Sequence, residues 1–302
     1  MQEPVFMYDS GTITARLART HKTLVQGVRF SIKQGESLAL IGETGSGKTM
    51  IALSLMQLLP SNVQMKGGSI RFLNQETLEV RRMRKLLGTD IVYIPQNGLE
   101  FLNPSKKICH HLYDSLKKNG VPGKQLKQTA LKKLTAVGFE APEQVMDQYP
   151  FQLSGGMAQR VTIALAHCAQ PSLVIADEPT NGLDYAARLH FMQMLDELFP
   201  DAARLVITHD IAVAQMCTKT LVLCGGKMME TGASLTILQN PRHPYTRALK
   251  DALVQNGMKE TPVLRGESGD CPFIRRCPQG KENCMCAHHK DADREWWCCM
   301  EQ

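Results

Sequence analysis

The sequence predicts an α/β fold around a parallel sheet, and this prediction rests on two short apolar runs and one glycine-rich loop. The run Leu173-Val-Ile-Ala-Asp-Glu178 places four apolar residues directly before two acids. A run of this length is typical of a strand buried on both faces of a parallel sheet. Its carboxyl end is where open α/β sheets bind their ligands. A second run, Ser37–Ile41, leads directly into the glycine-rich loop.

The composition indicates a globular protein with a full apolar core. The chain has 302 residues, 43% of them hydrophobic, and a net charge of +6 that is spread along its length. A mild and dispersed positive charge does not favour nucleic-acid binding. No run of 18 apolar residues occurs, so we expect no membrane span. The first residues lack the basic and apolar regions of a signal peptide, so we expect the chain to stay in the cytoplasm.

The remaining elements follow from periodicity and turn residues. Alternating apolar and polar positions over residues 4–34 predict antiparallel strands before the main sheet. A polar stretch with helical spacing predicts an inserted helical subdomain at about residues 97–165. Two more strands are expected at 91–94 and 204–208, and a hairpin with a Gly-Gly turn over 219–230.

The glycine-rich loop has the spacing of a phosphate-binding loop, which is Gly, four residues, then Gly-Lys-Thr. Its residues are Gly42, Glu43, Thr44, Gly45, Ser46, Gly47, Lys48 and Thr49. Glycines allow successive backbone N–H groups to turn toward one anion. The helix expected from Lys48 to about Leu59 adds its N-terminal dipole. We expect Lys48 to reach the outer phosphates and the Thr49 hydroxyl to bind magnesium.

Polar residues at further places are candidates for the same site. Gln96 and His209 each follow a predicted strand, and the carboxyl ends of such strands present ligand-binding groups. Ser154, Gly155 and Gly156 open a helix, which is a capping signal and an anion-binding signal together. In the acidic run, one acid is suited to hold a metal ion and the other to handle a proton.

These motifs occur in one order: phosphate loop, Gln96, Leu-Ser-Gly-Gly, acidic strand, Leu183-Asp184 and His209. In this order they resemble the nucleotide-binding subunit of an ATP-binding-cassette (ABC) transporter, and the resemblance covers residues 1 to about 240. It implies a P-loop NTPase cassette with a parallel-sheet core, an antiparallel β subdomain and an inserted helical subdomain. A Cys-rich C-terminal extension over residues 241–302 is expected to follow.

The resemblance implies roles for the acids and their neighbours. Asp177 would hold Mg²⁺ together with Thr49, and Glu178 would be the general base that polarises the attacking water. Gln96 would contact the magnesium and couple the site to a permease. His209 would be the switch histidine at the γ-phosphate.

The resemblance also implies that ATP is bound by two chains. The loop from Gly42 to Thr49 would hold the phosphates of one ATP. Ser154, Gly155 and Gly156 would bind the γ-phosphate of an ATP held by the other subunit, with Asp184 at the dimer interface.

The tail narrows the resemblance to the peptide and nickel importer subfamily. Pro241-Arg-His-Pro-Tyr-Thr-Arg-Ala-Leu249 and the segment that begins at Cys271 resemble its C-terminal extension, which can carry a 4Fe–4S cluster. Four thiolates suit either iron–sulfur or zinc. The resemblance implies four ligands, which are Cys271, Cys277, Cys284 and Cys298. Cys286 and Cys299 stay open as alternatives for the fourth ligand. A zinc site and a set of unligated thiols stay open as alternatives to the cluster itself.

The implied function is ATP hydrolysis at a subunit interface, coupled to uptake of oligopeptides, nickel or other metal chelates. The implied partners are two integral-membrane permeases, a second related ATPase subunit or a copy of this chain, and an extracellular binding protein. The chain would lie on the cytoplasmic face of the inner membrane. Two alternatives are a soluble cassette ATPase that acts on ribosomes or nucleic acid, and one of iron–sulfur assembly. The His-Pro-Tyr-Thr-Arg segment argues against both.

Some positions depart from the family pattern. The region Ala18–Lys22 offers no Tyr, Phe or Trp to stack on adenine, which leaves Arg19 or His21 for that contact. Asn97-Gly98 stands where an Asp-Pro pair is common, and Asn181-Gly182 is a glycine variant of the family's loop. Neither of these two changes removes a catalytic group.

Overall fold

Both apolar runs form strands in which every residue is buried. In the structure, a computed structural model, they are β5 (Ser37–Ile41) and β9 (Leu173–Asp177). Unbroken burial along a strand is expected where both faces of a parallel sheet are covered. β9 pairs in parallel with β8 (Ile91–Ile94), and β5 pairs in parallel with β11 (Lys219–Cys224). The predicted α/β class is therefore confirmed.

The structure describes residues 3–18, 20–75, 80–252, 270–279, 284, 286–291 and 293–299. These residues form two units. Unit 1 is built mainly from residues 80–206, and unit 2 from residues 6–32 and 36–75 with the described residues from 207 onward. The described part of the extension belongs to unit 2, and the predicted boundary near residue 240 stays a prediction.

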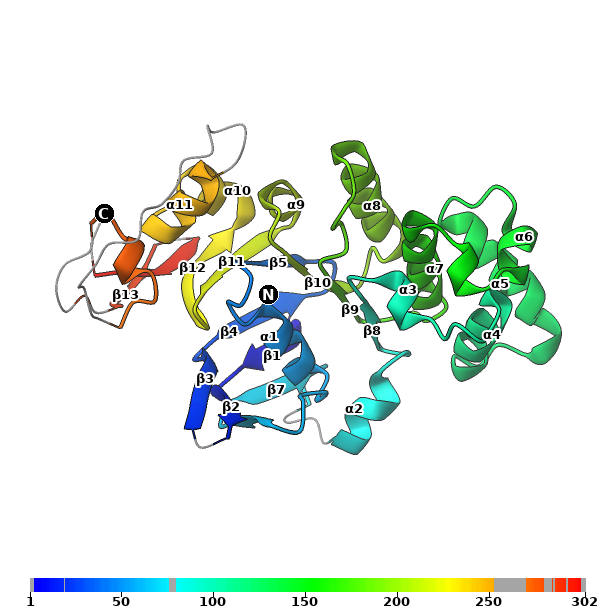
Figure 1. The fold of residues 1–302 in the computed structure, drawn as a ribbon, viewed down its shortest axis with the longest axis horizontal. Coiled ribbons are helices and arrows are strands. Elements are labelled where there is room, and N and C mark those ends of the chain that lie inside the picture. The colour runs from blue at the N-terminus through cyan, green and yellow to red at the C-terminus, as the bar shows by residue number, and fades with distance from the viewer. Residues whose placement is uncertain are drawn as a thin grey trace. The chain divides into compact units, whose positions relative to one another are not determined.

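Unit 1 combines β8, β9 and most of β10 (Ala203–Thr208) with a group of helices (Figure 1). The helices are α2 (Val80–Leu86), α3 (Gly98–Phe101), α4 (Ile108–Lys118), α5 (Leu126–Ala136), α6 (Pro142–Asp147), α7 (Gly155–His167) and α8 (Tyr185–Leu198), with 3₁₀ turns at Gly123–Gln125 and Pro150–Gln152. Helix α4 packs against α5, and Leu112 and Leu116 of α4 and Leu134 of α5 are fully buried, as expected of amphipathic helices. The helices α3 to α7 lie close to the range of about 97–165 expected for a helical subdomain, whereas α2 and α8 lie outside it, and the bounds of that subdomain stay a prediction.

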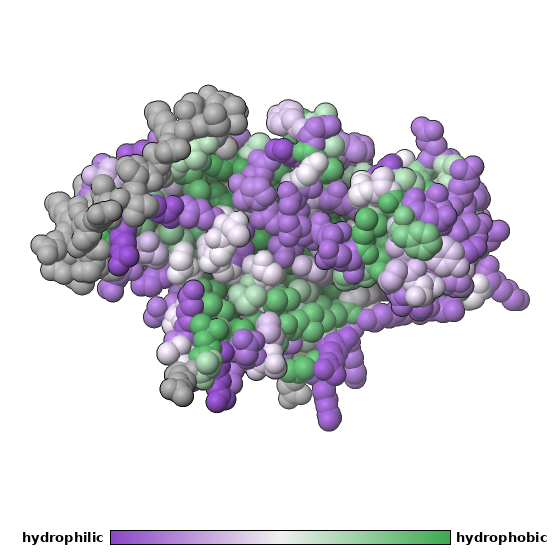
Figure 2. All heavy atoms as spheres, viewed as in Figure 1, coloured by the Kyte–Doolittle hydropathy of each residue, from purple (hydrophilic) through white to green (hydrophobic). Residues whose placement is uncertain are grey.

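The surface of unit 1 carries apolar side chains near α3. Figure 2 shows an apolar area over α3 and α7, and Phe101 of α3 is 54% exposed. Phe151, in the 3₁₀ turn before α7, is 73% exposed. Among the described residues, no helix is long and apolar enough to cross a membrane.

Unit 2 begins with the short strands that the alternating pattern predicts. They are β1 (Pro4–Asp9), β2 (Thr12–Leu17), β3 (Thr20–Gln26), β4 (Arg29–Lys33), β6 (Val63–Lys66) and β7 (Ser69–Phe72). They form two three-stranded sheets, in the orders β4-β1-β7 and β3-β2-β6. Phe6, Ile13, Val25 and Ile32 from these strands are almost completely buried, so the strands share an apolar interior.

The second part of unit 2 is a sheet that continues from β5 into the tail. β11, β12 (Lys227–Ala233), β14 (Arg294–Trp297) and β13 (His288–Lys290) follow β5 in that order. The β11–β12 turn is the predicted Gly-Gly pair. The helices of this unit are α1 (Lys48–Leu55), α9 (Ile211–Met216), α10 (Ser234–Gln239) and α11 (Pro244–Asp251), with the 3₁₀ turn η4 (Ile274–Arg276). The α1 helix ends before the predicted Leu59, because Gln57 takes a left-handed backbone with φ 55°.

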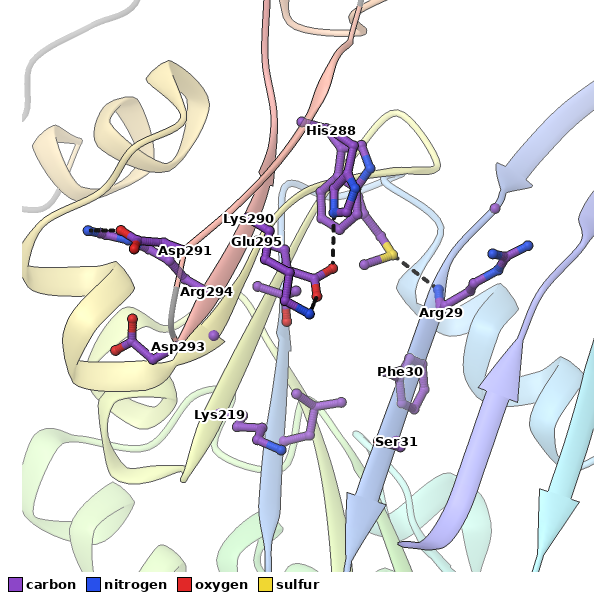
Figure 3. A pocket seen from close by; sticks show the side chains of 16 residues that line it. Arg29, Phe30, Ser31, Lys219, His288, Lys290, Asp291, Asp293, Arg294 and Glu295 are labelled. Atoms are coloured by element: carbon purple, nitrogen blue, oxygen red, sulfur yellow. Dashed lines mark hydrogen bonds and ion pairs between the residues drawn. The ribbon is translucent and has the colours of Figure 1, made fainter. Parts of the chain in front are cut away.

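A cavity of about 590 Å³ lies in unit 2 between β4 and the last two strands (Figure 3). Glu295 accepts from His288 at 3.1 Å and from Lys290 at 3.0 Å across the strand pair. Arg294 lies 3.6 Å from Asp291. These charges compensate one another, so this wall of the cavity does not present a cluster of one sign.

Candidate active site

The glycine-rich loop of unit 2 has the backbone that an anion-binding loop requires. Gly42 has φ 155° and Gly47 has φ 102°, in a range that side chains with a Cβ rarely adopt. A Cβ at Gly42 would lie 2.1 Å from the Leu223 carbonyl oxygen, and one at Gly47 would lie 2.7 Å from Cγ2 of Val25. The loop therefore packs against β3 and β11 at distances that only glycine permits. It leads into α1, whose N-terminus has no side-chain cap.

Two polar side chains in this loop fit a phosphate group. Lys48 is 7% exposed, and its Nζ donates to the carbonyl oxygens of Gly42 at 2.7 Å and Glu43 at 3.1 Å. Ser46 Oγ is buried and has no hydrogen-bond partner among the described residues. A buried hydroxyl without a partner is costly, and a bound oxyanion would supply one. Thr49 is exposed on the first turn of α1, where its hydroxyl is open to a ligand.

Gln96 follows β8, and the two acids lie at the end of the neighbouring strand β9, both in unit 1. The register pairs Ile94 of β8 with Ala176 of β9, so Gln96 and Asp177 both lie near the carboxyl ends of a parallel pair. This is the placement that the sequence predicts. Asp177 is buried, and Gln96 is exposed. Sequence reasoning missed Tyr93, which is on β8 and donates from its hydroxyl to Asp177 Oδ2 at 3.1 Å.

Burial of Tyr93, followed by the charge of Asp177, raises the pKa of this phenol well above its usual range. The hydroxyl therefore stays protonated and serves as a donor to the carboxylate. A hydrogen bond to a charged group is stronger than one between neutral groups, so Tyr93 fixes the orientation of Asp177.

Glu178 has a strained backbone. Its φ is 47°, in the left-handed region that costs an ordinary L-residue roughly 1–2 kcal/mol. Its carbonyl accepts the N–H of Asn181 at 3.1 Å, so the chain turns immediately after the strand. Backbone strain of this kind is typical of functional sites, and here it belongs to the residue that the sequence marks as the base.

The Ser-Gly-Gly segment opens α7, as the sequence predicts. Ser154 is the N-cap and accepts the N–H of Met157 at 3.3 Å. Ser154, Gly155 and Gly156 are exposed, and a Cβ added at either glycine would meet nothing within 4 Å. The N-terminal N–H groups of this helix are therefore accessible from outside the unit.

Asp184 and His209 lie at ends of elements in different units. Asp184, in unit 1, is the N-cap of α8 and accepts the N–H of Ala187 at 2.8 Å. His209, in unit 2, is exposed directly after β10, which confirms its place at a strand end. Asp210 then caps α9 through the N–H of Ala212 at 2.8 Å.

The tail cysteines contact one another in pairs. The Cys271 thiol donates to Cys286, a contact that together with burial raises the pKa of Cys271 to about 12 and lowers that of Cys286. The Cys284 thiol forms a hydrogen bond with the free Cys299, and burial followed by this contact raises the pKa of Cys284 to about 12. Cys277 and Cys298 are also buried. Across the described part of the chain, His, Cys, Asp and Glu residues form no group of three or more that could hold a metal ion. This arrangement therefore does not support the expected 4Fe–4S cluster or its zinc alternative.

A family model described as ABC transporter matches residues 25–181. The chain belongs to the ABC transporter family. A second model, described as the C-terminal region of oligopeptide/dipeptide transporters, matches residues 229–284. The predicted resemblance is confirmed in both parts. As a member of the ABC transporter family, the chain is an ATP-hydrolysing subunit, and the alternative of a soluble cassette outside transport is not favoured.

Curated relatives cover most of the chain. The dipeptide transport ATP-binding protein DppD of Haemophilus influenzae is 36% identical over 86% of this chain and 83% of its own. The oligopeptide transport ATP-binding protein OppD of Escherichia coli is 36% identical over 88% of this chain and 83% of its own. A solved dimeric ATP-binding cassette with bound ADP and phosphate matches with a TM-score of 0.67 at 26% identity, over 76% of this chain and 98% of that one. The ABC cassette fold is thereby confirmed.

The departures from the ABC transporter pattern have structural explanations in part. Of the two candidates for adenine stacking, Arg19 lies outside the described residues, and His21 is exposed on β3. Asn97 is the N-cap of α3 and accepts the N–H of Leu99 at 3.1 Å. A Cβ at Gly98 would lie 2.9 Å from the backbone of Ala158, so glycine allows α3 to pack against α7.

Proposed function

We propose that this chain drives the import of dipeptides or oligopeptides. The observation that carries the proposal is the match of residues 229–284 to the C-terminal region of oligopeptide/dipeptide transporters. The names of the relatives point the same way, since they are dipeptide and oligopeptide transport ATP-binding proteins. Nickel or metal-chelate uptake, which the sequence left open, has no comparable support.

The roles of the unit 2 residues rest on the loop geometry. Lys48 and the loop N–H groups bind the ATP phosphates, Ser46 adds a buried hydroxyl, and Thr49 holds Mg²⁺. When bound, the metal ion neutralises phosphate charge, which is what phosphoryl transfer needs most. His209 senses the γ-phosphate.

The roles of the unit 1 residues rest on the strand ends. Asp177 holds the metal ion in the orientation that Tyr93 imposes, and Gln96 joins it from the neighbouring strand. Glu178 accepts a proton from the attacking water. A positioned base of this kind contributes roughly 10² to 10⁴ in rate.

Two surfaces support partners. The open start of α7 suits ATP held by a second cassette, either a related subunit or a copy of this chain, with Asp184 close to that interface. The exposed Phe101 and Phe151 suit docking to membrane permeases, because large exposed aromatic residues mark interaction sites. With two permeases and an extracellular binding protein, the chain would act as a peripheral subunit at the cytoplasmic face of the membrane.

The substrate is tested by uptake into cells that lack this chain. Radiolabelled dipeptide, hexapeptide and nickel uptake are compared after the wild-type chain or Glu178→Gln is returned. Restoration of peptide uptake by the wild type alone is expected. Restoration of nickel uptake without peptide uptake would overturn the proposal.

The cluster stays a prediction from the resemblance, and it is tested separately. Iron, acid-labile sulfide and zinc are measured on protein purified without oxygen. About four iron and four sulfide per chain would establish the cluster. One zinc per chain without sulfide would show a structural zinc in place of the cluster. If neither iron nor zinc is found, the cysteines are unligated thiols.

A further inference from the structure

The tail holds the phosphate-binding loop at one residue, Glu43. The hydroxyl of Tyr245, on α11, accepts the backbone N–H of Glu43 at 3.0 Å. The guanidinium of Arg276, at the end of η4, donates to both oxygens of the Glu43 side chain, at 2.6 Å and 2.9 Å. Glu43 is therefore fixed through its backbone and its carboxylate by two residues that follow it by more than 200 positions.

Tyr245 is held rigidly in this position. It is 1% exposed, and its own N–H is accepted by His243 Nδ1 at 3.0 Å. The completely buried Glu230 of β12 accepts the N–H groups of Arg242 at 3.0 Å and His243 at 3.1 Å. These hydrogen bonds join the backbone of Arg242 and His243 to a buried carboxyl group of the sheet. The start of α11 is thus anchored to β12, and Tyr245 presents its hydroxyl from a fixed support.

Arg276 is positioned by an aromatic contact. Its guanidinium lies 5.2 Å from the centre of the Phe273 ring, within the range of a cation–π interaction. The same ring lies 5.2 Å from the ring of Tyr245, so the two residues that contact Glu43 share one support. The pKa of Arg276 is raised by its bond with Glu43. Bidentate pairing of arginine with a carboxylate adds geometric specificity to the charge attraction.

We propose that Tyr245 and Arg276 are positioning residues of the ATP site, and we call this pair the loop clamp. Lys48 Nζ donates to the carbonyl oxygens of Gly42 and Glu43. The peptide group between Gly42 and Glu43 is therefore bonded by Lys48 at its carbonyl oxygen and by Tyr245 at its N–H. A loop rich in glycine loses much conformational freedom on ordering. A loop that is ordered before ATP arrives binds ATP more tightly, because less freedom is lost on binding.

The test measures nucleotide affinity of the purified chain, which does not depend on what the transporter imports. Tyr245→Phe, Arg276→Gln and Glu43→Gln should each weaken MgATP and MgADP binding about threefold to tenfold. In the assembled transporter, KM for ATP should rise with little change in kcat. Arg275→Gln is the matched control, since the neighbouring Arg275 is exposed, and it should bind as the wild type does.

The charge reversal Glu43→Arg with Arg276→Glu should recover affinity relative to either single reversal, which a general loss of folding would not allow. Glu43→Gln leaves the tail sequence intact, so it stays informative if a tail variant misfolds. Wild-type affinity in folded Tyr245→Phe and Glu43→Gln would overturn the clamp. It would leave the peptide proposal untouched, which the uptake measurement decides.

Discussion

The two glycine-rich helix starts of this chain differ in how complete they are. The phosphate loop before α1 is packed against β3 and β11, and it is contacted by Lys48, Tyr245 and Arg276. The Ser-Gly-Gly start of α7 is exposed, and nothing lies over its glycines. Both present N–H groups to an anion. The first is contacted by other parts of the same chain, whereas the second is open, and in the proposed function a ligand held by another subunit completes it.

The largest expected effect comes from replacing Glu178, which is the base in the proposed function. Glu178→Gln should lower ATP turnover by roughly 10² to 10⁴, and ATP should then hold two cassettes together. Turnover and the dimer fraction on size exclusion with ATP are measured. Glu197→Gln, on the exposed side of α8, is the control. Unchanged turnover in Glu178→Gln would remove Glu178 as the base.

A charge at the open helix start separates binding from hydrolysis. Gly156→Asp should lower ATPase activity of the assembled transporter on the order of 100-fold, as loss of a preorganised oxyanion contact does. ATP affinity of the isolated chain should not change, and its melting temperature should stay near the wild-type value, because the added side chain meets nothing. Gly156→Ala is the control. Weaker ATP binding by the isolated Gly156→Asp chain would show that this helix start already belongs to its own ATP site.

The opposite result is expected in the phosphate loop. Lys48→Ala removes a charge that is buried among loop carbonyls. It should weaken ATP binding of the isolated chain at least about tenfold, down to the loss of detectable binding. Binding is followed by titration calorimetry, with the exposed Lys127→Ala as control. Wild-type affinity would refute the assignment of the loop.

The smallest effect is expected at the strand end. Tyr93→Phe removes one donor to Asp177 and should lower kcat roughly threefold to tenfold. It should also weaken Mg²⁺ binding, so that half-maximal activity requires a higher Mg²⁺ concentration. Tyr113→Phe, on α4 of the same unit, is the control, since it likewise removes one phenol hydroxyl. A variant with unchanged kcat and Mg²⁺ dependence would show that the orientation of Asp177 does not rely on Tyr93.

The sequence predicts the parts of the site that depend on local patterns. The loop from Gly42 to Thr49 is recognisable because its backbone needs glycine at fixed spacing, and Asp177 and Glu178 because an apolar run ends at them. The hairpin over 219–230 follows from its Gly-Gly turn. Each of these signals lies within a few residues of the feature it predicts.

The parts that the sequence did not predict depend on distant contacts. Nothing near Tyr93 indicates Asp177, which is 84 positions away. Arg276 appears as one of two adjacent arginines, and only the fold distinguishes it from the exposed Arg275 by placing it on Glu43. The left-handed backbone of Glu178 also has no local signal, since no glycine or asparagine stands there.

The ion pair between Glu43 and Arg276 joins residues 233 positions apart. This separation determines how long after Glu43 the ribosome adds Arg276. At roughly 5–20 residues per second, a ribosome needs about 12 to 47 seconds to add that length of chain. During this interval the phosphate loop and its first helix are already made while the arginine that fixes them is not. A nascent chain should thus acquire full nucleotide affinity late in translation, and ATP would bind the finished protein in preference to its incomplete precursors.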